Sequence, residues 1–381
     1  MKKTFFFAAL MMVAAMFTAC NSGGTPMDDT TKLWPACDAK AEHVGYINSK
    51  GEMAVAAMYD QAIMYSCGYG RVKLAGNYYF LDKNGKSVQD APNFSDGCDP
   101  YFYYDCLCYC VGNKWGMVDK NFKTIIQPAY DFLGYMSSEG LVAFRMSSDD
   151  KYGFLNKKGE TVIAANYDYT DRFVDGVAVV EVGEKYGAID TKGQFAINAI
   201  YDRLESIGEG RIAFIDYKAG KGGMLDTKGN VIIQAIYDAT QGFADNGLAP
   251  VRSNDKWGYV DKNGNVKLNF MYEDAAPFYE GYAWIQRTEE SNYELIDTNG
   301  STVLTLGKRE IPGGVFHNGL CKVYAYSDGG SETTKYIDTK GTMVYSWTVN
   351  YNAPARVNGV QKMNIAEMFA PTQYGARFNK K

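Results

Sequence analysis

Short runs of Val, Ile and aromatic residues recur along the chain, and polar turn residues separate each run from the next. In "GVAVVEV" (176–182) and "GLAPVRS" (247–253), a glycine starts a run of strand length. β-branched and aromatic residues in such short runs, bounded by Gly, Asn and Asp, are typical of β-strands. The pattern therefore predicts many short strands joined by tight turns.

One turn in each unit starts with Asp or Asn, and these turn acids are Asn48, Asp82, Asp119, Asn156, Asp190, Asp226, Asp261, Asp297 and Asp338. Three residues later comes Gly51, Gly85, Gly159, Gly193, Gly229, Gly264, Gly300 or Gly341, and only the third unit differs, with Phe122. The acid can accept a hydrogen bond from the backbone two residues on, and glycine adopts positive φ without a Cβ clash. The even spacing of the acids indicates a repeat of about 35 residues.

Two further positions recur at fixed distances from the turn acid. A tyrosine follows by eleven residues and precedes an acid in each case: Tyr59, Tyr130, Tyr167, Tyr201, Tyr237 and Tyr272. An aromatic residue lies four positions before the acid, and in four units glycine follows it: Trp115-Gly116, Tyr152-Gly153, Tyr186-Gly187 and Trp257-Gly258. We expect the ring to pack between neighbouring sheets, the glycine to admit another backbone, and the acid after Tyr to fix a turn.

The phrase "K-[WY]-G-x-[ILV]-[DN]-x-x-G", followed by "YD" and "F-x-x-G-x-A-x-V", resembles the WG-repeat family of bacteria. The resemblance covers about residues 43–345. It implies an all-β repeat protein and, for most members of the family, no assigned activity.

A single unit of three or four antiparallel strands cannot bury both of its faces, so neighbouring units must stack. We predict a propeller-like arrangement over residues 33–350, with about eight blades closed by pairing the two ends of the chain. The alternative is an open or superhelical β-array. Residues 351–381 form a C-terminal tail without the repeat, which could close the array.

The first residues predict a targeting signal rather than a part of the folded domain. Lys2 and Lys3 precede the apolar run "FFFAALMMVAAMF" (5–17), which is too short to span a bilayer. "FTAC" ends at Cys20 and resembles the lipobox of bacterial lipoproteins, which implies a signal peptide at 1–19 and acylation of Cys20. Residues 20–32 then form the lipidated start and a flexible tether. The alternative is ordinary secretion, in which Cys20 is not acylated and has no special role.

Composition and charge narrow the function class. A formal net charge of −5 argues against a nucleic-acid partner, and His43 and His317 alone cannot build a histidine metal or catalytic cluster. No catalytic set, cofactor or metal site is predicted. The leading interpretation is a non-enzymatic binding or scaffold module, lipid-anchored in the bacterial cell envelope at the outer membrane, whose partner is an unknown envelope protein or glycan. The alternative is an envelope enzyme that acts on glycan or peptide through a carboxylate-lined cleft.

The stretch "CDPYFYYDCLCYC" (98–110) predicts the binding face. The distance from Gly97 to Asp119 is longer than the matching distance in other units, which reads as an insertion. The candidate binding residues are its aromatic residues: Tyr101, Phe102, Tyr103, Tyr104 and Tyr109. Its alternating Cys106, Cys108 and Cys110 are core residues, disulfide partners, or metal or redox ligands.

Overall fold

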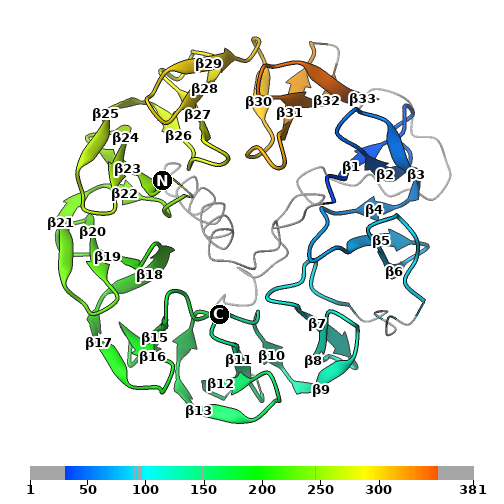
Figure 1. The fold of residues 1–381 in the computed structure, drawn as a ribbon. Helices are drawn as coiled ribbons and strands as arrows, with labels where there is room; N and C mark the ends of the chain where they lie inside the picture. The colour runs from blue at the N-terminus through cyan, green and yellow to red at the C-terminus, as the bar shows by residue number, and fades with distance from the viewer. Residues whose placement is uncertain are drawn as a thin grey trace.

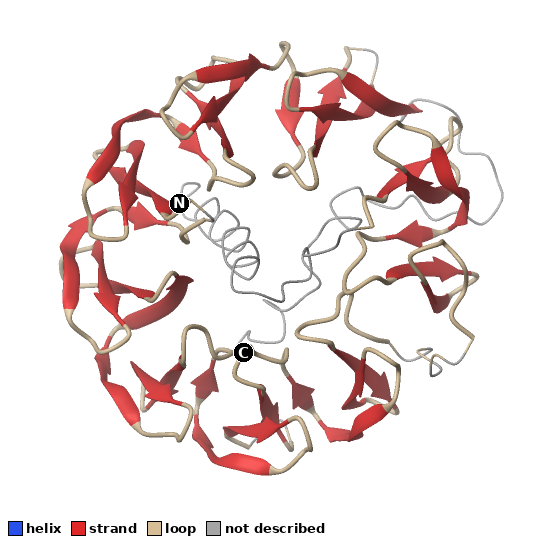
Figure 2. Ribbon diagram, viewed as in Figure 1, coloured by secondary structure: helices blue, strands red, loops and turns tan. Residues whose placement is uncertain are grey.

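The computed structural model describes residues 31–350, except residues 90, 92, 93, 95, 96, 148, 149, 245 and 329. Within these residues every regular element is a β-strand (Figure 2). The strands form nine small antiparallel sheets arranged in a ring, which makes the molecule a nine-bladed β-propeller (Figure 1). The prediction of a propeller-like all-β repeat is confirmed, and the open array is wrong.

Blades 1 to 3 have three strands each: β1 (Trp34–Cys37), β2 (Val44–Ile47), β3 (Met53–Tyr59); β4 (Gln61–Ala62), β5 (Gly70–Leu74), β6 (Asn77–Leu81); and β7 (Cys106–Val111), β8 (Lys114–Asp119), β9 (Thr124–Tyr130). Blades 4 to 6 have four strands each: β10 (Phe132–Leu133), β11 (Leu141–Arg145), β12 (Tyr152–Asn156), β13 (Thr161–Tyr167); β14 (Tyr169–Thr170), β15 (Val177–Val182), β16 (Lys185–Asp190), β17 (Phe195–Tyr201); and β18 (Arg203–Gly208), β19 (Arg211–Asp216), β20 (Lys221–Asp226), β21 (Val231–Tyr237). Blades 7 to 9 also have four: β22 (Ala239–Thr240), β23 (Leu248–Ser253), β24 (Lys256–Asp261), β25 (Val266–Tyr272); β26 (Asp274–Ala275), β27 (Tyr282–Gln286), β28 (Tyr293–Asp297), β29 (Thr302–Thr305); and β30 (Glu310–Pro312), β31 (Leu320–Tyr326), β32 (Ser331–Asp338), β33 (Met343–Asn350). In each four-stranded blade the first strand faces the axis of the ring and the last strand lies at the rim (Figure 1).

The turn acids form the hairpin between the last two strands of every blade except blade 2, where Asp82 follows the last described strand, β6. At Asp190 the carboxylate Oδ1 accepts hydrogen bonds from the backbone N–H groups of Lys192 and Gln194, both at 2.9 Å. Gly193 has a φ of 80°, which a β-branched residue rarely adopts. The same bonds form at the other eight acids, so the turn is a property of the repeat.

The glycine after the repeated aromatic faces a β-bulge in the outer strand. A Cβ atom built on Gly187 would lie 2.6 Å from the carbonyl oxygen of Ile197, and the register of β16 against β17 shifts between Tyr186 and Ala188 and again between Ala188 and Ile189. The same carbonyl approach recurs at Gly116, Gly153 and Gly258. The expectation that this glycine admits another backbone is therefore confirmed.

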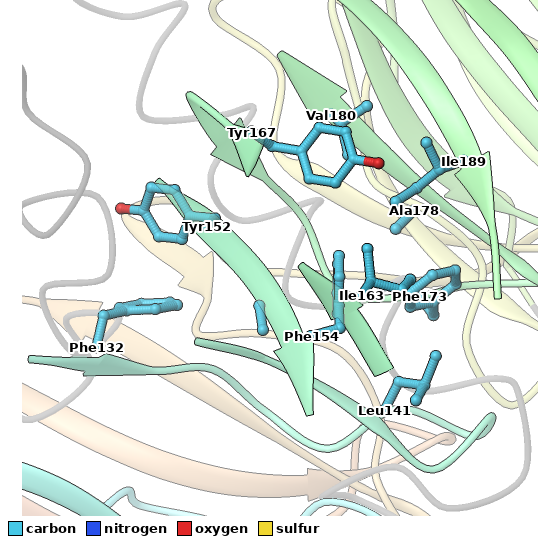
Figure 3. Close-up of a cluster of buried hydrophobic side chains, with 11 residues drawn as sticks. Phe132, Leu141, Tyr152, Phe154, Ile163, Tyr167, Phe173, Ala178, Val180 and Ile189 are labelled. Atoms are coloured by element: carbon cyan, nitrogen blue, oxygen red, sulfur yellow. The ribbon is translucent and has the colours of Figure 1, made fainter. Parts of the chain in front are cut away.

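Neighbouring blades pack face to face through apolar side chains. Figure 3 shows the cluster between blades 4 and 5, where Phe154 of blade 4 meets Phe173 of blade 5 at a ring-centroid distance of 4.7 Å. In the eight blades that have a turn glycine, this glycine also rests against the outer strand of the blade before it. Gly193, for example, would place a Cβ atom 3.1 Å from Ile163 of β13.

In three central repeats the acid after the repeated Tyr joins two blades. Asp168 follows β13, and its Oδ1 accepts from Lys151 Nζ of blade 4 while its Oδ2 accepts from the Gly183 N–H in the hairpin of blade 5. Asp202 and Asp238 make the same pair of bonds one and two repeats later. The acid therefore fixes a turn, as expected, and also holds successive blades in register.

The ring closes where blade 1 meets blade 9. Gly51 rests against Val344 of β33 just as the other turn glycines rest against the preceding blade. Trp34 Nε1 donates to the carbonyl oxygen of His317 at 3.0 Å, and Tyr336 Oη donates to that of Pro35 at 2.9 Å. No described sheet contains strands from both ends of the chain. The prediction of about eight blades closed by strand pairing is wrong, because each end forms a blade of its own and the two blades pack.

Candidate functional site

Two carboxylates from neighbouring blades come together at the inner wall of the ring. Asp171 directly follows β14, the inner strand of blade 5, and Glu205 lies in β18, the inner strand of blade 6. Arg203, two residues before Glu205, donates from Nη1 to Tyr186 Oη at 3.3 Å and lies over the Tyr186 ring at 5.2 Å. We call Asp171, Glu205 and Arg203, with Tyr169 and Tyr186, the inner-wall cluster.

Burial and mutual repulsion shift the protonation of this pair. Burial and, to a lesser degree, the negative charge of Asp171 raise the pKa of Glu205 to about 7, against the opposing charge of Arg203. Burial also raises the pKa of Asp171, against the opposing charges of Arg172 and Arg203. One of the two carboxyl groups can therefore carry a proton near neutral pH.

A cavity of about 60 Å³ lies beside the cluster, between blades 6 and 7. Arg203 and Glu205 line it from blade 6, and Gln241 lines it from blade 7. Gly222 of β20 also lines it, at the position four residues before the turn acid where six of the other eight blades carry an aromatic residue. The cavity is therefore explained by a missing ring.

The segment 98–110 is not an insertion. Asp105 takes the place of the glycine that starts the second strand elsewhere: it lies 14 residues before Asp119, as Gly176 lies before Asp190, and both have positive φ. The alignment on Gly97 is wrong, because Asp105, and not Gly97, precedes the second strand β7 as Gly176 precedes β15. The segment divides into an inner bridge at Cys98, a loop and the start of β7.

The aromatic residues of this segment separate into core and wall. Phe102 is fully buried and Tyr109 is 6% exposed, so both belong to the core. The rings of Tyr103 and Tyr135 stack with their centroids 3.8 Å apart. Arg172, the residue that follows Asp171, lies 6.0 Å from the centroid of the Tyr103 ring. The role of Tyr101, Tyr103 and Tyr104 in binding stays a prediction.

The cysteines of the same segment are core residues. Cys106 and Cys108 pack with Leu133 and Val142 between blades 3 and 4. None of the described cysteines forms a disulfide with another. Across residues 31–350, apart from the nine positions left out, no group of three or more His, Cys, Asp and Glu side chains could hold a metal ion.

Sequence reasoning missed both parts of the site, although each leaves a signal. Asp171 and Glu205 lie four residues after the repeated Tyr167 and Tyr201, so they occupy equivalent positions in consecutive repeats. The phrase "KGG" at 221–223 replaces the aromatic with glycine in one central repeat only.

The signal peptide, Cys20 and the tail at 351–381 lie outside the described residues. The part of the chain that the structure describes contains no helix that could serve as a membrane span.

The fold is similar to that of several solved structures. A eukaryotic initiation factor matches with a TM-score of 0.56 at 11% identity, over 84% of this chain and 96% of that one. Dihydro-heme d1 dehydrogenase NirN matches at 0.44 and 10% identity, over 84% and 74% of the two chains, and apo AztD from Citrobacter koseri at 0.36 and 12%, over 74% and 95%. At these identities the first match supports the fold alone. No curated protein matches the chain.

Six segments match the family model described as the WG containing repeat: residues 45–78, 115–148, 152–186, 186–215, 223–257 and 257–288. Most matches run from the third strand of one blade into the next blade, so one sequence repeat spans two blades. The stretch 216–222, which ends at Gly222, falls between two matched segments. Because the matches cover slightly more than half of the 381 residues, the chain belongs to the family of proteins built from the WG containing repeat.

Proposed function

We propose that this protein is a non-enzymatic binding or scaffold module, held by a lipid at Cys20 in a bacterial cell envelope, at the outer membrane. Its partner is an envelope protein or glycan, and the binding site is the inner-wall cluster with the adjoining cavity. The repeated turns, bulges and inter-blade acids support a rigid ring, which suits a module that presents a preformed surface.

The cavity at Gly222 is the observation that carries this proposal. Ligand sites are concave and largely apolar, with a few polar groups placed at their edges. Here Ala213 and Ile215 supply apolar wall, whereas Arg203 and Glu205 supply charge. In repeat proteins, binding residues tend to lie where one repeat departs from the others, as this one does.

Binding is tested with the full processed chain and an extract of envelope proteins and glycans. Combining Arg203→Ala with Glu205→Gln should weaken binding of any retained partner at least tenfold, because both rim charges are lost. Glu289→Gln, in an exposed loop of blade 8, is the control and should bind like the wild type. Equal binding by the double variant would exclude the inner wall as the site.

The lipid anchor is tested separately. Cys20→Ser should release the protein from membranes or leave it unprocessed, because acylation needs the cysteine thiol and stable anchoring needs several acyl chains. Cell fractionation with a labelled fatty acid measures this. Membrane-bound, acyl-labelled variant protein would contradict the anchor at Cys20.

The paired carboxylates favour a second candidate, a glycan-hydrolysing enzyme of the envelope. Glycoside hydrolysis commonly uses two carboxyl groups, one of them protonated, and the pKa of Glu205 at about 7 suits the acid. Release of reducing ends from envelope glycans at neutral pH, lost in Glu205→Gln, would establish this activity. Binding without release would leave the binding module as the function.

A further inference from the structure

Gly222 lies in a row of paired residues across blade 6, and the same row can be compared in the neighbouring blades. Strand pairing places Arg203, Ile215, Gly222 and Tyr237 side by side across blade 6. The same row in blade 5 is Tyr169, Glu181, Tyr186 and Tyr201. The position of Gly222 is therefore the position of the Tyr186 ring.

The row of blade 6 faces blade 7. Met224, two residues after Gly222 and so on the same face of β20, packs with Val251 and Val260 of blade 7. In blade 7 the equivalent of Gly222 is Trp257, which is 7% exposed and packs with Ala275 and Phe278 of blade 8. A ring therefore occupies this position in the blades on either side, whereas in blade 6 the residue at this position is a glycine.

The surroundings of the vacancy are suited to an apolar ring. In blade 5 the Tyr186 hydroxyl donates to Glu181 Oε2 at 3.1 Å and accepts from Arg203. The matching residues around Gly222 are Ile215 and Ala239, so apolar residues stand at the positions of both polar partners. Loss of the ring and loss of its polar partners occur together, which leaves an apolar recess with a charged rim.

The size of the recess sets how a ring can enter. A void that encloses benzene is roughly 150 Å³, whereas this cavity is about 60 Å³. A ring would therefore insert by its leading edge and leave its remainder in the mouth. Tyr186 is itself only partly buried at its own interface, so partial insertion matches the repeat. A side chain delivered by a partner polypeptide can be held in this way.

We propose that the cavity between blades 6 and 7 binds the aromatic side chain of a partner polypeptide, inserted where the repeat's own ring is missing. This inference rests on the proposed binding function and names the ligand class of that site. A ring at Gly222 would contact Ile215 and Ala239, and the peptide backbone that carries it would meet Arg203 and Glu205 at the rim.

The probes are N-acetyl-phenylalaninamide and N-acetyl-tryptophanamide, with N-acetyl-leucinamide as the non-aromatic control. Saturation-transfer NMR with the full processed chain should detect the aromatic probes and not the leucine probe. Gly222→Trp should reduce the signal at least tenfold, because the chain then fills its own recess. A Cβ atom at Gly222 would lie 3.3 Å from the Phe214 carbonyl oxygen, which is a tight contact that a small shift relieves.

Trp257→Gly is the matched control, because it opens the equivalent recess between blades 7 and 8. It should add a second site for the aromatic probes. If Gly222→Trp fails to fold, Ala239→Leu narrows the same recess from blade 7 and should also weaken binding. The inference would be overturned if the wild type gave no saturation-transfer signal with the aromatic probes while Trp257→Gly bound them.

The two proposals fail in different ways. An envelope partner that binds Gly222→Trp as well as it binds the wild type would overturn the aromatic ligand and leave the binding function standing. Loss of that partner in Gly222→Trp, with binding intact in Glu289→Gln, would support both.

Discussion

At the scale of single residues, Gly264 is constrained twice. Its φ is 84°, and a Cβ atom would lie 2.8 Å from Cγ1 of Ile233 in the preceding blade. Gly264→Val should therefore lower the free energy of unfolding by about 1–3 kcal/mol, the range for an unsuitable residue in a sparsely allowed backbone region. Chemical denaturation measures this change.

The two constraints can be separated with a second glycine. Gly247 also has positive φ, at 70°, but a Cβ atom there would meet nothing within 4 Å. Gly264→Ala should therefore be more destabilising than Gly247→Ala, because only the first adds a clash. Equal losses would mean that contact with the neighbouring blade is unimportant.

Glu205 predicts a pH dependence at the same scale. Its pKa is about 7 in the folded protein and near 4.5 when unfolded, so between these values the folded state binds more protons. Stability contributed by this group falls as pH rises from about 4.5 to about 7. Glu205→Gln should be more stable than the wild type above pH 7 and similar to it below pH 4.5. Thermal melts across this range would contradict the assignment if the difference did not change with pH.

At the scale of elements, the described part of blade 2 has no outer strand, and Phe122 compensates. Phe122 occupies the turn-glycine position of blade 3 with φ of 60°, and its ring lies 5.1 Å from Tyr69 and 5.2 Å from Phe80. No described outer strand blocks the ring, because β6 is the last described strand of blade 2. The unit that breaks the turn pattern therefore lies at the blade boundary where the described residues form no outer strand.

Phe122→Gly sets two effects against each other. Glycine relieves the positive φ, which stabilises by about 1 kcal/mol, whereas removing a buried phenyl group costs about 3–5 kcal/mol. The net loss should be about 2–4 kcal/mol, measured by denaturant unfolding. A stabilised variant would show that backbone strain outweighs the aromatic cluster.

The elements also show how far the sequence could be interpreted. Hairpin turns, the glycine beside the bulge and the acid after Tyr follow from local chemistry, so their fixed spacing predicts them. The number of blades does not follow from local chemistry, because β1 and β33 carry few of the repeated sequence positions. Only their packing shows that they belong to separate blades. The electrostatic interaction of Asp171 with Glu205 depends on the inner strands of two blades lying side by side on the inner wall of the ring, which no single repeat specifies.

At the scale of the whole molecule, the ring is closed by side-chain packing between blades 1 and 9. Trp34 is 1% exposed and donates a hydrogen bond to His317 across this interface. Trp34→Ala should cost about 3–5 kcal/mol, as expected for truncation of a large buried ring. Because no described strand crosses the closure, the loss should appear first at that interface.

Hydrogen exchange locates this loss along the chain. In Trp34→Ala, amides of β1, β2, β31 and β32 should exchange faster, whereas those of blades 5 to 7 should keep their protection, since local opening needs only the contacts at the closure. Trp257→Ala is the matched variant at the interior boundary of blades 7 and 8, and it should leave β1 and β32 protected. Uniform loss of protection around the ring in Trp34→Ala would instead mean that the nine blades open as one cooperative unit, so that the closure is no weaker than any interior interface.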